Sequence, residues 1–283
     1  MRVTTKKRIK IVTDSSADIT ALEGIEFASA PLKIITAQKE YVDNPDLDAA
    51  QMATELSEYK GKSSTSCPNT SDWLAAFGDA ELIICITITA TLSGSYNSAL
   101  IAKREYEEAH PDRRVVVINS LSTGPEMLLI AEKARDLAKE DAEFDEICEK
   151  LDEYAKTTGL LFMLESIKNL ANNGRVSHIV AKMTGILGIR LLGRASNVGD
   201  LEALNKCRGE RKTLETIVER LIEFGYAGGK LRIAHCLNEA AGKSLAELVE
   251  NRFPGADILI YKCGGLCSFY AEKGGMLVGF ERG

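Results

Sequence analysis

The segment from Ile83 to Ala99 constrains the fold more than any other part of the chain. It begins as an almost continuous apolar run, which is typical of a strand buried on both faces. It then breaks into small hydroxyl residues around Ser93 and Gly94 and continues, from Tyr96 on, as an amphipathic helix pattern. A strand, a polar turn and a helix N-terminus together suit an anion, either phosphate or carboxylate. A hydroxyl-rich helix cap with no ligand explains the segment equally well.

Two further polar segments resemble this one. Asp14 and Ser15 follow a short apolar run that starts at Ile9, and ligands of open parallel sheets collect at the carboxyl ends of strands. Residues 63–71 are rich in hydroxyls and are predicted to form a loop, with Ser71 as the N-cap of a short helix. By itself, the segment 63–71 is better interpreted as an ordinary capped connection without a ligand.

The order of predicted elements indicates two α/β units of different type. In the first half, the patterns predict strands near 9–13, 82–88 and 114–118 and helices near 71–78, 95–109, 125–140 and 144–157. In the second half, they predict helices at 165–172, 177–187, 210–225 and 239–252 and strands near 189–193, 201–207, 230–236, 257–263 and 276–281. We therefore expect a parallel-sheet α/β domain with helices on both faces over residues 1–158. An α+β domain with a mixed or antiparallel sheet should cover residues 159–283.

Charge and motifs argue against several classes of function. A net charge of −6 and a pI near 5.4 are unlike a nucleic-acid-binding protein, which usually needs a basic face. No apolar run approaches a membrane span, and none resembles a signal peptide, so the cytoplasm is the expected location. No phosphate-binding P-loop, dinucleotide fingerprint or nucleophile elbow is present, and no cofactor is expected. Cys263 and Cys267 are the only close cysteine pair, and no further ligands lie nearby in sequence to complete a zinc site.

Several short motifs occur in an order that resembles one known family. They are Asp14-Ser15, Thr65-Ser66-x-Pro68, Leu92-Ser-Gly-Ser-Tyr96, Gly174-Arg175 and the segment from Lys206 to Lys212. In this order and spacing, the chain resembles the DegV family of bacteria over nearly its whole length. Each motif is short, and the specificity of the match lies in their order.

The resemblance implies a two-domain α/β protein that binds one long-chain fatty acid at the domain junction. The acyl tail would lie in a buried tunnel, and Thr65, Ser66, Ser93 and Gly94 would meet the carboxylate. In the best understood members of the family, the resemblance implies, the protein is the lipid-carrying subunit of bacterial fatty acid kinase. It presents the carboxylate to a separate ATP-binding subunit and does not supply the catalytic machinery itself. The turn at Arg175 would lie near the ligand entrance, where the partner could dock; a surface ion pair is the alternative.

One departure from the family concerns the head-group site. The family usually has His-Thr-Gly-Pro-Gly before its last strand, and that histidine helps to hold the carboxylate. Here the segment runs from Tyr270 to Gly274, with Tyr270 at the histidine's position. A tyrosine hydroxyl can donate one hydrogen bond but is not cationic at neutral pH. We expect Tyr270 to join the site; the alternative is that Tyr270 packs and that Glu272 or Lys273 faces the pocket.

Two other functions remain open on the sequence. One is a lipid carrier that serves no kinase, and the other is an enzyme or binder for a small phosphorylated ligand at the same helix N-terminus. The apolar residues between Val180 and Leu192 do not decide the matter, since a lipid tunnel and a protein core have the same composition. A long apolar cavity beside Ser93 would favour the lipid, and a short polar one the phosphate.

Overall fold

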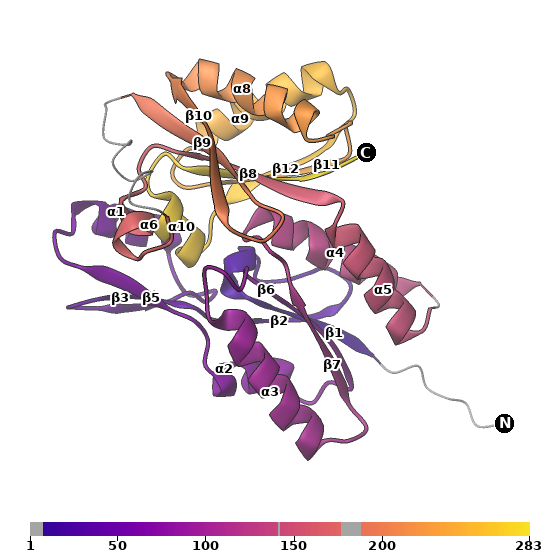
Figure 1. The fold of residues 1–283 in the computed structure, drawn as a ribbon. Helices are drawn as coiled ribbons and strands as arrows, with labels where there is room; N and C mark the ends of the chain where they lie inside the picture. The colour runs from indigo at the N-terminus through magenta and orange to yellow at the C-terminus, as the bar shows by residue number, and fades with distance from the viewer. Residues whose placement is uncertain (1–7, 141, 177–187) are drawn as a thin grey trace.

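The computed structural model describes residues 8–140, 142–176 and 188–283, which form three sheets with helices packed around and between them (Figure 1). The helix predicted at 177–187 lies outside the described residues. Sheets of four and three strands are built from the first half of the chain, and a six-stranded sheet is built from the second half.

The four-stranded sheet is parallel, with the order β2-β1-β6-β7. Its strands are β1 (Ile9–Asp14), β2 (Glu26–Ala30), β6 (Leu82–Thr87) and β7 (Arg114–Asn119). Its helices are α2 (Thr70–Phe77), α3 (Ser95–Ala109), α4 (Pro125–Lys139) and α5 (Phe144–Ala155). Ile84 and Ile86 pack with the core of α4, whereas Ile83 and Cys85 pack with α2 and α3. The apolar run is therefore a strand covered on both faces, which confirms the predicted parallel sheet.

The six-stranded sheet is mixed, with the order β10-β9-β8-β13-β11-β12. Its strands are β8 (Thr158–Leu164), β9 (Ile189–Ala195), β10 (Leu201–Arg208), β11 (Lys230–His235), β12 (Asp257–Lys262) and β13 (Met276–Glu281). Only the β11–β12 pair is parallel, as the crossover through α9 (Glu239–Arg252) requires. Helices α8 (Glu210–Glu223) and α9 cover one face of this sheet. Helix α4 packs against β13, β11 and β8 and also contacts β1 and β6, so it lies between the two larger sheets.

Residues 63–71 differ from the prediction. Ser63–Ser66 is a strand, β5, rather than part of a loop, and it pairs with β3 (Lys33–Thr36) next to β4 (Glu40–Val42) and helix α1 (Ala49–Glu58). Its hydroxyl residues gave no strand pattern, and the strand exists because β3 offers its backbone groups to it. The N-cap of α2 is Asn69 rather than Ser71, because Asn69 and Asp72 form a reciprocal capping box.

Two short helices complete the second half of the chain. Helix α6 (Lys168–Asn172) follows β8, and α10 (Gly265–Ala271) lies between β12 and β13. Helix α10 contacts α1, β3 and the 3-10 turn Ser15–Ala17, so a segment near the end of the chain packs against the first half.

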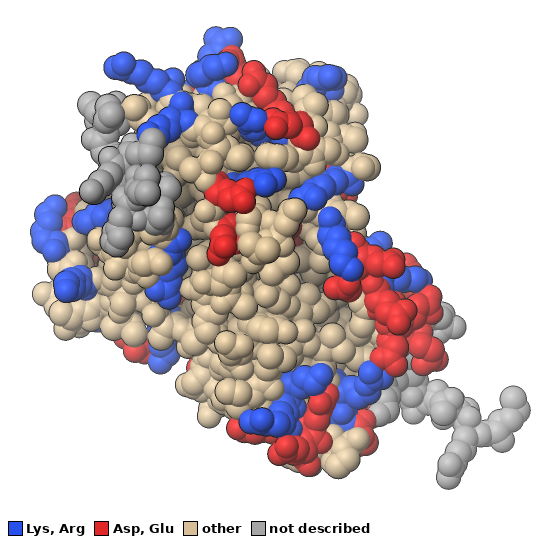
Figure 2. All heavy atoms as spheres, in the orientation of Figure 1, with Lys and Arg blue, Asp and Glu red and all other residues tan. Residues whose placement is uncertain are grey.

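Figure 2 shows a broad uncharged area in the lower centre of the face in view, with charged side chains above it and around its edges. Acidic side chains gather over α5, which carries Asp145, Glu146, Glu149, Asp152 and Glu153. Such a surface does not attract the phosphate backbone of a nucleic acid. Within the described residues, no helix combines the length and the apolar character needed to cross a membrane.

Candidate functional site

An apolar cavity of about 280 Å³ lies at the junction of the two halves of the chain. Its walls come from β8, α10 and β13 on one side and from the β5 and β6–α3 segments on the other. Most of the lining side chains are aliphatic or aromatic: Leu32, Ile88, Leu92, Leu160, Phe162, Leu164, Leu170, Leu201, Leu266 and Leu277. The exposed surface within the cavity is therefore mainly hydrocarbon, with the polar groups confined to a few residues.

Those few polar residues include every site residue predicted from the sequence. Thr65, Ser66, Ser93, Gly94, Arg175 and Tyr270 all line this cavity. They come from β5, the β6–α3 turn, the turn after α6, and α10. Segments separated by up to 205 positions therefore meet here, as the hydrogen bond of 2.7 Å between the Thr65 and Tyr270 hydroxyls illustrates.

The β6–α3 turn presents a helix N-terminus to the cavity. Gly94 is the N-cap of α3 and has no side chain with which to cap the helix. The Ser93 hydroxyl oxygen accepts a hydrogen bond from the Ser95 N–H at 3.2 Å, which leaves its proton available to donate. A Cβ at Gly94 would lie 3.2 Å from Cys67 Sγ, so the glycine permits the close approach of β5 to this turn. The arrangement favours an anionic group in front of α3.

Asp14, the last residue of β1, fixes the position of this turn through hydrogen bonds. Its buried carboxylate accepts hydrogen bonds from the Ile88 N–H at 2.9 Å and from the Ser95 hydroxyl at 2.6 Å. Burial raises the pKa of Asp14, and hydrogen bonds from Ser16, Ser95 and Ile88 oppose that rise. The sequence located Asp14 at the carboxyl end of β1, and the structure adds that its carboxylate ties β1 to the turn that carries Ser93. We describe it as a positioning residue.

Tyr270, which the resemblance assigns to the position of a histidine, lines the cavity. Burial raises its pKa, while the hydrogen bond from Thr65 and the charge of Arg175 act in the opposite direction. The phenol is thus protonated at neutral pH and shares one hydrogen bond with Thr65. One proton of the two hydroxyls remains to be donated elsewhere. The alternative candidates, Glu272 and Lys273, are not among the residues that line the cavity; a Glu272 carboxylate oxygen instead accepts the Asn169 N–H at 3.0 Å.

Arg175 is held against the same turn. Its Nε donates to the Leu92 carbonyl at 3.1 Å, and its guanidinium also donates to the Asn173 carbonyl. The surface ion pair considered as an alternative is replaced by these two carbonyl contacts. Arg175 therefore brings positive charge to the lining of the cavity.

Helix α10 was missed by sequence reasoning, although it carries Tyr270. It has seven residues, begins after Gly264, and gives no amphipathic pattern of useful length. Asp43 fixes its first turn: one carboxylate oxygen accepts the Gly265 N–H at 2.7 Å and the other accepts the Leu266 N–H at 2.9 Å. The Ser15 hydroxyl also donates to Asp43, at 2.8 Å. No local signal in the sequence connects Asp43 with a helix more than 200 residues later.

A metal centre finds no support in the described part of the chain, where no cluster of three or more His, Cys, Asp or Glu is placed to hold an ion. Cys263 and Cys267 are both buried, and burial raises the pKa of both thiols.

Comparison with known proteins gives a consistent result over the whole chain. A family model described as "Uncharacterised protein, DegV family" matches residues 8–282. A DegV domain-containing protein of Streptococcus pneumoniae is 42% identical over 276 residues, which cover 96% of this chain and 98% of the relative.

Solved structures are similar to the same extent. A DegV family protein from Eubacterium eligens, loaded with heptadecanoic acid, has a TM-score of 0.95 at 44% identity, and the match covers 97% of this chain and 100% of that one. The Fatty Acid Kinase (Fak) B3 protein of Streptococcus pneumoniae, loaded with linoleic acid, has a TM-score of 0.95 at 42% identity, covering 98% and 100%.

Proposed function

We propose that this chain, which belongs to the DegV family, binds one long-chain fatty acid with its acyl tail in the apolar cavity and its carboxylate at the Thr65–Ser93 end. The observation that carries the proposal is the cavity itself, which is lined mainly by Leu, Ile and Phe and has only a few polar side chains, among them the hydroxyls of Thr65, Ser93 and Tyr270. A phosphorylated small molecule would leave most of this apolar wall against water, which argues for the lipid over the phosphate ligand.

The acyl tail supplies most of the binding free energy. Each buried methylene contributes about 0.8 kcal/mol, so ten of them contribute on the order of 8 kcal/mol. One charge-assisted hydrogen bond to the carboxylate contributes roughly 1.5–3 kcal/mol. The tyrosine in place of a cationic histidine therefore changes the head-group contribution without removing the basis for tight binding.

The head-group site consists of hydroxyls and a helix N-terminus. In the proposed pose the Ser93 hydroxyl and the Gly94 N–H donate to one carboxylate oxygen, and the Thr65–Tyr270 hydroxyl pair donates to the other. Ser66 lines the same end of the cavity. Support for this assignment comes from Gly94 at the N-cap of α3 and from the 2.7 Å contact between Thr65 and Tyr270.

The chain itself is a ligand-binding and ligand-presenting protein rather than a catalyst. Its similarity to the Fak B3 protein over nearly the full length of both chains supports a fatty acid kinase catalytic subunit as the partner. Arg175, at the rim of the cavity, is the residue we assign to contact with that partner. All seven cysteines are free thiols, which suits a reducing compartment and supports a cytoplasmic location.

Native mass spectrometry of the purified protein tests the lipid class directly. We expect a co-purified mass in the range of C16–C18 fatty acids, released on denaturation. A protein that carries no acyl chain after purification, and that binds none after incubation with heptadecanoic acid, would refute the proposal.

Substitutions then test the head-group site. Thr65→Val and Ser93→Ala should each weaken heptadecanoate binding by delipidated protein about tenfold. Ser64→Ala is the matched control, because Ser64 is the exposed neighbour of Thr65 in the same strand and does not line the cavity. If both site variants bind as tightly as Ser64→Ala, the carboxylate lies elsewhere.

A further inference from the structure

A second cavity, which we call the interdomain cleft, lies on the other side of α10. It has a volume of about 750 Å³ and is lined by Ser15, Asp18, Asp43 and Asp48 from the first half of the chain and by His235 and Lys262 from the second, among others. Gly265 and Ser268 of α10 face this cleft, whereas Leu266 and Tyr270 face the acyl cavity. The helix is therefore a wall between two separate cavities, and the second is not explained by lipid binding.

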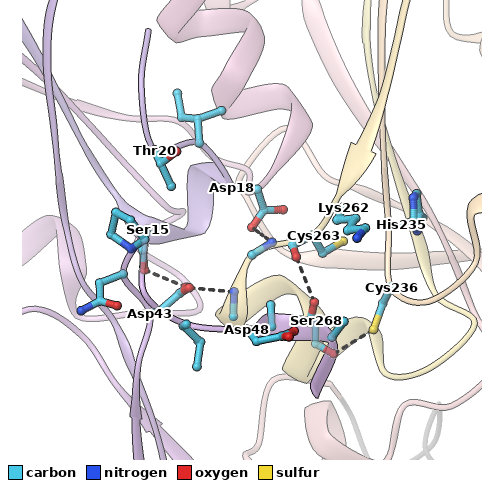
Figure 3. Close-up of a pocket in the computed structure, with 18 of the residues that line it drawn as sticks. Ser15, Asp18, Thr20, Asp43, Asp48, His235, Cys236, Lys262, Cys263 and Ser268 are labelled. Carbon is cyan, nitrogen blue, oxygen red and sulfur yellow. Dashed lines mark hydrogen bonds between the residues drawn. The ribbon is translucent and has the colours of Figure 1, made fainter. Parts of the chain in front are cut away.

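The cleft lies at the carboxyl ends of β11 and β12, the only parallel pair in the six-stranded sheet. His235 and Lys262 are the last residues of these strands and are register partners, so they stand on the same face of the sheet. Ile233 and Ile260 lie two positions before His235 and Lys262 in their strands, so they stand on the same face. A Cβ at Gly242 of α9 would contact both isoleucines, so α9 covers that face. Figure 3 shows the two basic side chains together at one end of the cleft. A strand end followed by a helix N-terminus is where α/β proteins hold phosphate groups.

His235 offers a hydrogen-bond donor that no described residue uses. His235 is only 5% exposed and lines the cleft. Its Nδ1 accepts the Asn238 N–H at 3.3 Å, which puts the proton of a neutral ring on Nε2. Burial is the main cause of its lowered pKa, which favours that neutral ring. Within the described part of the chain, Nε2 has no hydrogen-bond partner and, unlike the Tyr261 hydroxyl, it is not sealed from solvent, so a ligand in the cleft can reach it.

The first turn of α9 is also left uncapped. The Asn238 side chain, which occupies the N-cap position, donates to the Gly274 carbonyl at 2.9 Å and makes no capping bond to α9. The backbone N–H groups of this turn therefore add to the donors from His235 and Lys262. Lys262 is exposed, and among the described residues it forms no ion pair.

Each aspartate of the cleft accepts at least one backbone hydrogen bond, although Asp18 Oδ2 has no partner among the described residues. Asp43 accepts the N–H groups of Gly265 and Leu266, and Asp18 accepts the Gly264 N–H at 2.9 Å. Asp48 caps α1 by accepting the Gln51 N–H at 2.9 Å.

Glu239, in the first turn of α9, is paired with Lys243 at 2.8 Å. The donors that remain without a partner are thus gathered at the β11–β12 end.

We propose that the interdomain cleft binds a phosphate-bearing small molecule, with its phosphate held by His235 Nε2–H, Lys262 Nζ and the first turn of α9. The body of the ligand lies against an apolar strip of the same cleft formed by Ile19, Pro45, Leu47 and Leu237. This strip favours a phosphate ester with an apolar group over free phosphate. The site is separate from the head-group site of the fatty acid, from which α10 divides it.

NMR of the full-length protein tests this site without knowledge of the natural ligand. The chain has three histidines, His110, His178 and His235, so the His235 imidazole resonance is assignable by comparison with His235→Gln. Titration with phenyl phosphate should shift this resonance saturably, and inorganic phosphate should do so more weakly, because it cannot contact the apolar strip. Lys262→Ala should weaken phenyl phosphate binding about tenfold.

Lys212→Ala is the matched control, since Lys212 is an exposed lysine on α8, outside the cleft. Lys262→Ala removes only an exposed side chain and should fold normally. Its affinity for phenyl phosphate can therefore be measured even if His235→Gln fails to fold. An unchanged His235 resonance at millimolar phenyl phosphate would overturn the proposal. So would equal affinities of the Lys262→Ala and Lys212→Ala variants, which would mean nonspecific ion binding only.

Discussion

Replacing Asp43 with alanine should separate α10 from the first half of the chain. The 6% exposed Asp43 side chain accepts three hydrogen bonds, from the Ser15 hydroxyl and the Gly265 and Leu266 N–H groups. Alanine leaves all three donors without their acceptor, at the place where the two halves of the chain meet. Because α10 carries Tyr270, the same change should disturb the head-group site.

The size of the effect follows from these bonds. A hydrogen bond to a charged group contributes about 1.5–3 kcal/mol, so three of them set an upper bound of about 9 kcal/mol. Two effects reduce this sum. Burial raises the pKa of Asp43, so the variant is relieved of the cost of a buried charge. Asp43 also lines the cleft, so water can reach some of the orphaned donors. We expect the free energy of unfolding to fall by about 3–5 kcal/mol, the range for removing one partner from a buried charged contact.

Urea unfolding of delipidated protein measures this change, since bound ligand would otherwise add its own stabilisation. Asp46→Ala is the matched control, because Asp46 is exposed and lies in the same loop. The control should change the free energy of unfolding by less than about 0.5 kcal/mol. A loss below about 1 kcal/mol for Asp43→Ala would show that these bonds do not fasten α10, and the reasoning above would be wrong.

Three further predictions concern the head-group site and a buried acid. Tyr270→Phe should weaken fatty-acid binding by roughly 0.5–3 kcal/mol, because it removes one partner of the Thr65 hydroxyl; unchanged affinity by calorimetry would exclude the phenol from the site. Arg175→Ala should leave fatty-acid affinity unchanged and slow acyl phosphate formation with a kinase subunit, and full turnover with the variant would remove Arg175 from the docking surface. Asp18→Asn should raise the free energy of unfolding at pH 7 by about 1–3 kcal/mol, because burial raises the Asp18 pKa well above 3.8 and its Oδ2 has no partner among the described residues. The native state then binds a proton more readily than the unfolded state, so the free energy of unfolding falls as pH rises from 3.8 through the native pKa of Asp18. Urea unfolding at several pH values should show a smaller fall for Asp18→Asn. An identical pH profile for the variant and the parent would contradict the assignment.

Local sequence patterns predicted three strands of the parallel sheet, β1, β6 and β7, and the helices that cover it, whereas β2, the three-stranded sheet and α1 were not predicted. The apolar run from Ile83 has no alternation of polar residues, so both faces of the strand had to be covered, and helices cover both. The turn at Ser93 and Gly94 was also predictable, because the strand end, the hydroxyl residues and the helix start are adjacent along the chain. Strand and helix periods in the second half likewise predicted the mixed sheet and the helices that cover it.

Strand β5 and helix α10 were not predictable in this way. Ser63–Ser66 has the composition of a loop, and only its pairing with β3 makes it a strand. Helix α10 has too few residues for a periodic pattern and depends on Asp43, which is 222 positions from Gly265. Both elements owe their conformation to contacts made across the fold.

The sequence by itself therefore determined those strands, helices and polar turns whose patterns arise between near neighbours in the chain, such as β1, β6 and β7 and the turn at Ser93. Only the tertiary structure decided that Thr65, Ser93, Arg175 and Tyr270 line one cavity, because their meeting requires the two sheets to pack across α4 and α10. It also decided which leucines line a cavity and which fill a core, since burial against protein and burial against a ligand select the same side chains.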